Sequence, residues 1–250
     1  MPVRVAALYD IHGNLPALDA VLVEVEESGA DLVLAGGDVA LGPMPRETLE
    51  RLLSLGAGAR FVRGNCDREP ARSDAESEGL WAERSRWTAA QLTEEQRTLL
   101  AGLPETAVVD VDGLGPTLFC HATPRSDEEI VTRITPEERL REVLADVDQD
   151  VVVCGHTHVQ FDRSVGNVRL VNAGSVGMPY EGEPGAYWAL LGPDVQFRRT
   201  RYDLDAAAAA VRASGFPGAE EHAVENILAS ASAEDATQFF ESSAHGDTTS

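Results

Sequence analysis

The chain has 250 residues, enough for one large domain or two small ones, with the hydrophobic (43%) and charged (25%) fractions of a soluble globular protein. Asp and Glu outnumber Lys and Arg by 42 to 20, a formal charge of −22, which argues against a nucleic-acid polymer or an anionic membrane as main partner. We see no bilayer-spanning stretch, no export signal and no disulfide framework among the three cysteines, so we expect a cytoplasmic protein.

The first part of the chain alternates strands and helices. Apolar runs predict strands at residues 2–9, 31–35 and 60–63. The helix after the first strand has Asn14 as its N-cap and ends at Gly29, and a second helix is expected at about 45–55. Such alternation is typical of a parallel sheet with helices outside.

The middle of the chain begins with a polar, acidic stretch at about 68–104, which we interpret as a helical excursion across one end of the sheet, with Trp81 and Trp87 as apolar anchors. Thr93 and Gln96 have the spacing of a capping box for its last helix. Further strands are expected at 106–111, 117–120 and 151–154, and a helix opens near residue 135.

After residue 158 the pattern changes to short strands separated by glycine turns, as in an antiparallel meander. These strands are predicted at 161–165, 168–173, 187–191 and 195–202. Asp203 then caps a helix that reaches Val211, and helical pieces follow near 220–228 and 234–240. Two packed sheets with helices outside are the expected architecture.

Polar blocks follow five of the predicted strands. They are Asp10-x-His12, Gly37-Asp38, Gly64-Asn65-x-Asp67, His121 and Gly155-His156-x-His158, and they hold four of the six histidines. One such block alone is weak evidence, because an aspartate after a strand is often a turn residue or helix cap. Ligands gather at the carboxyl ends of strands in α/β sheets, so the set predicts a metal site there.

In this order the blocks resemble the calcineurin-like metallophosphoesterase superfamily, whose pattern is D-x-H, G-D, G-N-H-[DE], H and G-H-x-H. The resemblance covers about residues 1–202. The DIHGN block and the NAGSVG stretch at 172–177 are similar to its bacterial diadenosine-tetraphosphatase-related and small phosphodiesterase branches. The resemblance implies an α/β (α+β) fold of two mixed β-sheets flanked by helices. Together with the helical patterns after residue 203 and the small, polar last residues, it predicts one domain over 1–241, with a cap at about 68–104, C-terminal helices at about 203–241 and a disordered tail at 242–250.

The resemblance also implies the metal ligands. One ion would be held by Asp10, His12, Asp38 and His158, and the other by Asn65, His121, His156 and the shared Asp38. Imidazole and carboxylate ligands without thiolate favour Mn, with Fe, Ni, Co or Zn as alternatives, over calcium or copper(I). A shared carboxylate would hold the ions roughly 3.5–4 Å apart, and a hydroxide bridging them would attack the phosphorus in line.

The implied catalytic residues are Asn65, Cys66, Asp67 and His121, and one of them departs from the pattern. Cys66 stands where most of the family has a histidine that assists the leaving group, and Asp67 stands where the family acid orients that histidine. Because a thiol is a weaker donor, we expect a preference for esters with good leaving groups. A packing role without chemistry is the alternative for Cys66.

Three further residues are candidate substrate contacts. Arg68 and Arg125 could clamp non-reacting phosphate oxygens, although plain surface arginines are the alternative. Asn14 could orient phosphate or only cap its helix. In the NAGSVG stretch, Asn172 and Ser175 either support ligand histidines or shape the turn.

The favoured function is a dinuclear metal-dependent phosphohydrolase acting on a small phosphodiester or nucleotide. Dinucleoside polyphosphate hydrolysis is the alternative within the same class. A non-catalytic scaffold of this fold is the alternative of another class, and it is disfavoured because every ligand position is filled. The sequence leaves a homo-oligomer open.

Overall fold

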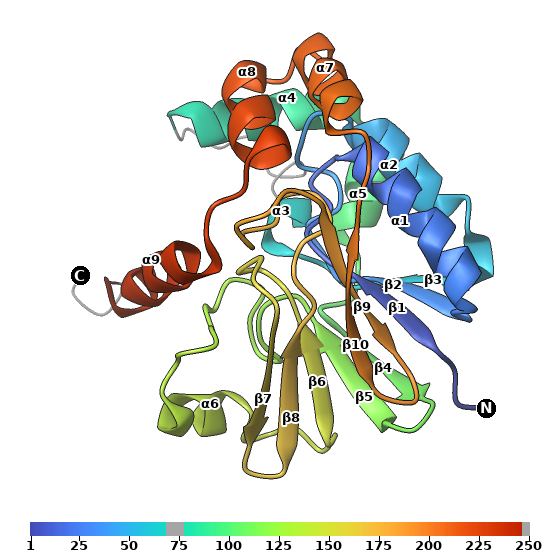
Figure 1. Ribbon diagram of the computed structural model, residues 1–250, viewed down its shortest axis with the longest axis vertical. Coiled ribbons are helices and arrows are strands. Elements are labelled where there is room, and N and C mark those ends of the chain that lie inside the picture. Colours follow the sequence, from blue (N-terminus) through green and yellow to red (C-terminus); the bar gives the residue numbers. More distant parts are fainter. Residues whose placement is uncertain (69–77, 247–250) are drawn as a thin grey trace.

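Two five-stranded sheets pack face to face in the computed structural model of the protein, which describes residues 1–68 and 78–246 (Figure 1). Residues 69–77 of the predicted excursion lie outside the described residues. The two-sheet architecture with flanking helices confirms the predicted fold class. Among the described residues, none of the helices is both long and apolar enough to cross a membrane.

The first sheet has the strand order β10-β9-β1-β2-β3. Its strands are β1 (Val5–Leu8), β2 (Leu32–Ala35), β3 (Ala59–Phe61), β9 (Ala186–Leu191) and β10 (Val195–Thr200). β1, β2 and β3 run parallel, because α1 (Leu15–Ser28) and α2 (Pro45–Leu53) return the chain between them. The predicted cap and stop of α1 are confirmed, since Asn14 Oδ1 accepts from Ala17 N and Gly29 ends the helix at φ 68°.

The second sheet has the strand order β4-β5-β6-β8-β7. Its strands are β4 (Thr106–Val111), β5 (Gly115–Cys120), β6 (Val151–Cys154), β7 (Phe161–Val165) and β8 (Val168–Asn172). The predicted single meander is wrong. The hairpin β7–β8 joins this sheet with β8 parallel to β6, whereas β9–β10 pairs with β1 in the other sheet. The local patterns differ, since β9 is a continuous apolar run and β7 is polar at its centre, but neither pattern indicates which sheet the hairpin joins.

The core lies in layers that follow the alternation of each strand. Val5 and Ala7 of β1 pack between the sheets, where they meet residues of the second sheet such as Phe119. Ala6 and Leu8 face the other way, toward α1 and α2. On the outer face of the second sheet lies α6 (Glu137–Val143), which buries Leu140. Helices therefore cover the outer faces, and the strand ends are left for the loops that carry the polar blocks.

The cap and most of the C-terminal region form one helical layer above the first sheet (Figure 1). It contains α4 (Leu80–Gln91), α7 (Leu204–Ala213), α8 (Ala219–His222) and a π-helical turn at Ala223–Leu228, whereas α5 (Glu94–Ala101) lies closer to the strands and buries Leu100 in the core of the first sheet. The rings of Trp87 and Phe216 meet edge to face at 5.4 Å, and Arg84 Nε donates to Pro217 O at 3.0 Å. The capping box of α5 is confirmed, whereas Trp81, at 50% exposure, does not anchor the cap.

The last helix, α9 (Ala233–Gly246), lies apart from that layer, to one side of the two sheets (Figure 1). It corrects the predicted disordered tail, because residues 242–246 are helical and only 247–250 lie outside the described residues. The short helix α3 (Asn65–Arg68) and a 3-10 turn at Gly56–Gly58 complete the elements that surround the strand ends.

Candidate metal centre

The predicted ligands lie together where five strands end. Asp10 and His12 follow β1, Asp38 follows β2, Asn65 opens α3 after β3, His121 follows β5, and His156 and His158 follow β6. Asp10, His12, Asp38, His121 and His158 are at most 6% exposed, while Asn65 and His156 are half-buried. Buried carboxylates and imidazoles at this density need compensation by counter-charges or a metal ion.

The backbone of these loops is in an unusual conformation. In the described part of the chain, the non-glycine residues with positive φ are Asp10, His12, Asp38, His156 and His158, with values from 48° to 68°. The left-handed region costs a side-chain-bearing residue about 1 kcal/mol or more. All five are predicted ligands. The tertiary structure therefore holds the backbone in the left-handed conformation at the positions where it directs ligand side chains toward the centre.

The inward-facing atoms come within a few ångströms of one another. His158 Nε2 lies 3.3 Å from both Asp10 Oδ1 and His12 Nε2. His121 Nε2 lies 3.5 Å from Asp38 Oδ2, which is 3.7 Å from His12 Nε2. Asp10 Oδ1 is buried and, within the described residues, accepts no hydrogen bond. An orphaned carboxylate oxygen among imidazole nitrogens is the arrangement expected of a cation site.

Each of three histidines is fixed by a hydrogen bond at its outer nitrogen. Nδ1 of His12 donates to Leu41 O at 3.1 Å, Nδ1 of His121 to Gly36 O at 2.9 Å, and Nδ1 of His158 to Met178 O at 2.7 Å. A carbonyl oxygen can only accept, so Nδ1 carries a proton in all three rings, and Nε2 is the nitrogen that faces the centre and would bind a metal ion once it is deprotonated. This backing is typical of metal-ligating histidines.

Two glycines of the polar blocks make room for the carboxylates. A Cβ at Gly64 would lie 2.1 Å from Asp38 Oδ1, and a Cβ at Gly155 would lie 2.5 Å from Asp10 Oδ2. Neither carboxylate can move away easily, because Asp38 Oδ1 accepts from Cys66 N and Asp10 Oδ2 accepts from His156 N, both at 2.9 Å. The G-N and G-H blocks therefore contain glycine for a steric reason.

The pKa values in the metal-free protein follow from burial and from these pairs. Burial by itself raises the pKa of Asp38, but His121 and His12 outweigh it and hold the pKa well below its usual range. Burial opposes the protonated form of His121, yet Asp38 and Asp10 raise its pKa above the ordinary value. Burial and the charge of His121 lower the pKa of His156 to about 4. Protonated imidazole is thus the counter-charge that a metal ion would replace.

Asn65, His156 and Cys66 border this centre. Asn65 Oδ1 lies 3.1 Å from His121 Nε2, and the His156 ring centroid lies 5.1 Å from that of His121. Cys66 Sγ comes within 4.8 Å of ligand atoms of His12 and Asp38, close to the centre as its predicted catalytic role requires. Burial and the charge of Asp38 raise the pKa of the Cys66 thiol well above its ordinary value, so it is protonated.

Among the described residues, the Asp67 carboxylate accepts from backbone N–H groups and forms no hydrogen bond with the Cys66 side chain, so its predicted orienting role needs correction. Asp67 Oδ2 accepts from Asp38 N and Gly64 N, and Oδ1 accepts from Val39 N, all at 2.9 Å. Burial and Asp38 raise the pKa of Asp67 to about 7, while the backbone donors oppose the rise. Because the surrounding groups are donors, Asp67 braces the Asp38 loop against α3.

The three predicted substrate contacts are engaged elsewhere. Arg68 donates to both oxygens of Asp127, at 3.0 and 3.1 Å, and also pairs with Glu128. Arg125 forms a two-pronged pair with Glu129 at 2.9 and 2.6 Å. In this structure neither guanidinium is available to a phosphate, because each is neutralised by acidic partners.

Asn14 is likewise a structural residue. Its Oδ1 caps α1, and its Nδ2 donates to Gly177 O at 3.1 Å. Ser175 Oγ donates to Asp10 O at 2.8 Å, and Asn172 Nδ2 donates to Gly155 O at 2.6 Å. The NAGSVG stretch therefore shapes the ligand-bearing loops through their backbone.

Sequence reasoning missed Tyr180, whose ring stacks on His158 at 4.9 Å with an interplanar angle of 18°. No motif marks it, although its position shortly after the NAGSVG stretch places it near the ligand loops. The side-chain hydroxyl of Tyr180 makes no hydrogen bond to any described residue, and burial raises its pKa to about 12.

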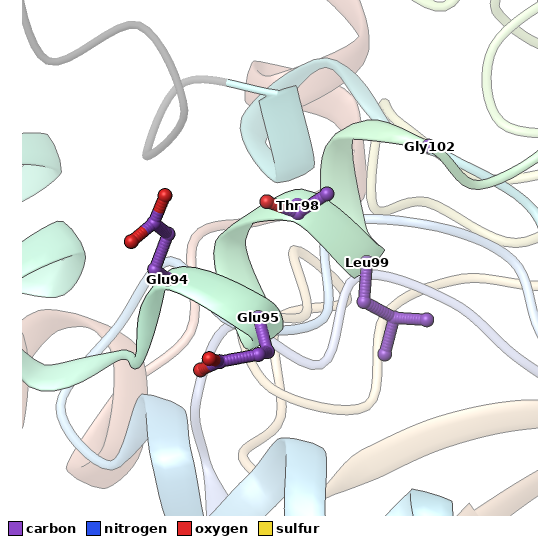
Figure 2. A pocket seen from close by; sticks show the side chains of 5 residues that line it. All are labelled: Glu94, Glu95, Thr98, Leu99 and Gly102. Carbon is purple, nitrogen blue, oxygen red and sulfur yellow. The ribbon is translucent and has the colours of Figure 1, made fainter.

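A surface hollow of about 680 Å³ lies elsewhere, on the outside of α5 (Figure 2). It is lined by Glu94, Glu95, Thr98, Leu99 and Gly102, and none of these is a predicted ligand. Two carboxylates at its edge would repel phosphate, so this hollow is not the candidate site.

Comparison with known proteins agrees with this geometry. Residues 3–192 match the family model described as the calcineurin-like phosphoesterase superfamily domain. The uncharacterized protein MJ0912 of Methanocaldococcus jannaschii is 27% identical over 226 residues, which cover 81% of this chain and 89% of that protein. The phosphodiesterase YfcE of Escherichia coli K12 is 29% identical over 190 residues, covering 72% of this chain and 83% of YfcE.

Two solved structures share the fold over nearly the whole chain. A metallophosphoesterase from Sphaerobacter thermophilus superposes with a TM-score of 0.72 and 28% identity, covering 90% of this chain and 99% of its own. The hypothetical protein PH1004 from Pyrococcus horikoshii OT3 superposes with a TM-score of 0.78 and 22% identity, covering 92% and 100%. The second likeness concerns the fold alone.

Proposed function

The chain belongs to the calcineurin-like phosphoesterase superfamily, and from that premise we propose that it hydrolyses a small phosphodiester or nucleotide with two divalent metal ions. It is a metal-dependent phosphoester hydrolase, and the phosphodiesterase YfcE is among its relatives. Mn²⁺ is the proposed metal, since the ligand set contains imidazole and carboxylate groups. The proposed substrate is small, because the chain carries a formal charge of −22 that disfavours a polyanion.

The observation that carries the proposal is the convergence of buried ligand atoms around a carboxylate oxygen, Asp10 Oδ1, that accepts no hydrogen bond from the described residues. Two overlapping groups, one of Asp10, His12 and His158 and one of Asp10, Asp38 and His121, each bring their ligand atoms within 4.8 Å. Asp10 Oδ1 has no hydrogen-bond partner there, and the Nε2 atoms face it. The residues present therefore fit divalent cations, with Asn65 and His156 as the proposed outer ligands of the second ion.

Bound divalent ions would supply a nucleophile at neutral pH and electrostatic stabilisation of the phosphoryl oxygens. The chain's own residues prepare the site for that chemistry. Leu41, Gly36 and Met178 carbonyls fix the imidazole rings, so their Nε2 lone pairs need no reorientation. Five of the ligands are at most 6% exposed, so water reaches the centre from the side of the half-buried His156 and Asn65. A phosphoester would approach from that same side.

Cys66 bears on the choice of leaving group. Its thiol is protonated and lies beside Asp38 at the edge of the centre, so it can offer at most a weak hydrogen bond to a departing oxygen. Asp67 is committed to three backbone donors and provides no relay to it. We therefore propose aryl esters, nucleotides and pyrophosphate links, whose leaving groups need little protonation, as substrates.

The test is hydrolysis of bis-p-nitrophenyl phosphate by protein loaded with Mn²⁺, comparing wild type with Asp38→Ala. We expect the rate to fall by at least about 10³-fold in Asp38→Ala, because the shared ligand is lost. Metal analysis should find two ions per wild-type chain and fewer than one in the variant. Asp19→Ala is the matched control, since Asp19 pairs only with Arg51 on the surface.

Equal rates in wild type and Asp38→Ala would remove the enzymatic proposal and favour a non-catalytic scaffold. Diadenosine tetraphosphate belongs in the same assay as the alternative substrate. If kcat/KM for diadenosine tetraphosphate exceeds that for every small diester and nucleotide tested, dinucleoside polyphosphates become the proposed substrates.

A further inference from the structure

A second feature lies beside the metal centre and comes from a part of the chain beyond the family match. The matched segment ends at residue 192, and α9 begins at Ala233. Two contacts hold the start of α9 against the loop after the metal ligands, since Ser230 Oγ donates to Pro179 O at 2.7 Å and Gly182 N donates to Ala231 O at 2.8 Å. These hydrogen bonds fix the start of α9 against the loop at residues 179–182.

The far end of α9 is tied to the second sheet's side of the molecule. Thr132 Oγ1 and Thr135 Oγ1 both donate to Glu241 Oε2, at 2.6 and 2.7 Å. A carboxylate that accepts two hydroxyl hydrogen bonds fixes the register of the helix. This register determines which residues of α9 face the metal centre, and Phe240 directly precedes the anchor.

Aromatic rings continue from the candidate ligands into α9. Tyr180 stacks on His158, and Phe240 lies 6.3 Å from Tyr180 and 6.4 Å from His156, measured between ring centroids. Phe239 meets Phe240 edge to face at 5.6 Å and is 66% exposed. A phenylalanine that is two-thirds exposed beside a catalytic centre leaves apolar surface in water, which a ligand ring could cover.

A cavity of about 250 Å³ lies among these rings. Its lining residues are Tyr180, Ala231, Asp235, Ala236, Phe239 and Phe240. That volume is below the roughly 300–1,000 Å³ of pockets that enclose a whole drug-sized ligand, so it suits one planar ring system. The Asp235 carboxylate on its wall would repel phosphate, so a phosphoester would keep its phosphate at the metal centre and its ring in the cavity.

We propose that α9 forms an aromatic subsite that stacks the planar ring of the phosphoester substrate, an aryl group or a nucleobase, against Phe240 and Tyr180. The inference rests on the proposed function, because the metal centre is what would hold the phosphate. It makes Phe240 a specificity-determining residue. It also gives the C-terminal extension a role that is separate from the fold.

The experiment measures binding to Mn²⁺-loaded protein by calorimetry with two matched pairs of phosphates. Phenyl phosphate is compared with methyl phosphate, and thymidine 5′-monophosphate with 2-deoxyribose 5-phosphate, so the two ring sources are distinguished. We expect the ring-bearing member of at least one pair to bind about 5- to 100-fold more tightly, the range of base–aromatic stacking. Phe240→Ala should reduce that ratio to near one.

Gln238→Ala is the control, because Gln238 is exposed on the same helix and does not line the cavity. A ratio near one in wild type for both pairs, or a ratio that survives in Phe240→Ala, overturns the subsite. The subsite is also overturned if the wild-type protein is a dimer, if Phe239→Ala and Phe240→Ala convert it to a monomer, and if the ratio of ring-bearing to ring-free affinity stays unchanged. That result would mean that a second chain covers the cavity.

Failure of the subsite and of the proposed function can be told apart, because ring-dependent binding and hydrolysis of bis-p-nitrophenyl phosphate are two separate measurements. Hydrolysis of bis-p-nitrophenyl phosphate together with ring-independent binding removes only the subsite. Ring-dependent binding without any hydrolysis removes only the enzymatic proposal.

Discussion

Replacing Asp67 by asparagine is expected to destabilise the metal-free protein by about 2–3 kcal/mol. The amide oxygen can keep the bonds from Asp38 N and Gly64 N, but the new NH₂ group then faces the Val39 N–H, a buried donor that loses its acceptor. An unsatisfied buried donor costs about 1–3 kcal/mol, and the two remaining bonds lose their charge assistance. Removing a negative charge beside Asp38 returns part of that loss.

The assay is urea unfolding at pH 8 with a chelator present, so that metal binding does not contribute and Asp67 is mostly ionised. Asp203→Asn is the matched control, because Asp203 accepts only from Ala206 N as a helix N-cap, where asparagine serves as well. It should stay within about 0.5 kcal/mol of wild type. If Asp67→Asn also stays within that range yet loses activity, Asp67 acts on the reaction and the brace is refuted.

The remaining predictions concern the metal, acid stability and the leaving group. Gly64→Ala should weaken Mn²⁺ binding by about 10- to 100-fold in a calorimetric titration, because its Cβ would displace Asp38, whereas Gly58→Ala, which meets nothing within 4 Å, should not. Saturating Mn²⁺ at 100 times its Kd should raise the unfolding free energy by about 2.7 kcal/mol in wild type and not in Asp38→Ala; a shift in both would mean binding elsewhere. Burial, and then Arg84, lower the pKa of His222 to about 3, so the unfolded chain binds the proton more tightly and stability falls as the pH drops below about 6.5. Between pH 6.5 and 5, wild type should lose about 2 kcal/mol more than His222→Phe in urea unfolding, and parallel losses would contradict the assignment. Cys66→His should raise kcat/KM for alkyl esters more than for aryl esters, and no gain on alkyl esters would show that Cys66 does not limit leaving-group protonation.

The ends of strands and helices are the features that local sequence patterns predicted well. The run Val151–Cys154 followed by Gly155 predicted β6 with its bounds unchanged, and Asn14, Gly29 and Thr93 predicted helix ends that the structure confirms. These features depend on nearest neighbours along the chain. The strand with which β9 pairs depends on tertiary packing, that is, on which apolar surfaces the two faces of β9 cover. The order of apolar and polar residues within β9 does not indicate those surfaces.

The roles of polar side chains were harder to predict than their positions. Arg68 and Arg125 were candidate phosphate contacts, with surface arginine as the alternative, and acidic residues neutralise both: Asp127 lies 59 residues from Arg68, and Glu129 lies four residues from Arg125. Asp67 was predicted to orient its neighbour, but the loop after β2 brings two N–H groups to its oxygens, and Gly64, three residues before Asp67, supplies the third. Tyr180 and Phe240 carry no motif, and only their placement beside His158 and His156 gives them a proposed role.

The sequence by itself determined the strand-and-helix alternation, the polar blocks at the strand ends and the family they indicate, because these depend on residue type and short spacing. Only the tertiary structure decided which oxygens and nitrogens are left without partners. Asp10 Oδ1 has none among the described residues, whereas the Asp67 oxygens have three donors. The physical reason is that a buried polar group takes whatever partner packing brings within about 3 Å, and two of the three Asp67 donors, Asp38 N and Val39 N, lie 29 and 28 residues away in the chain.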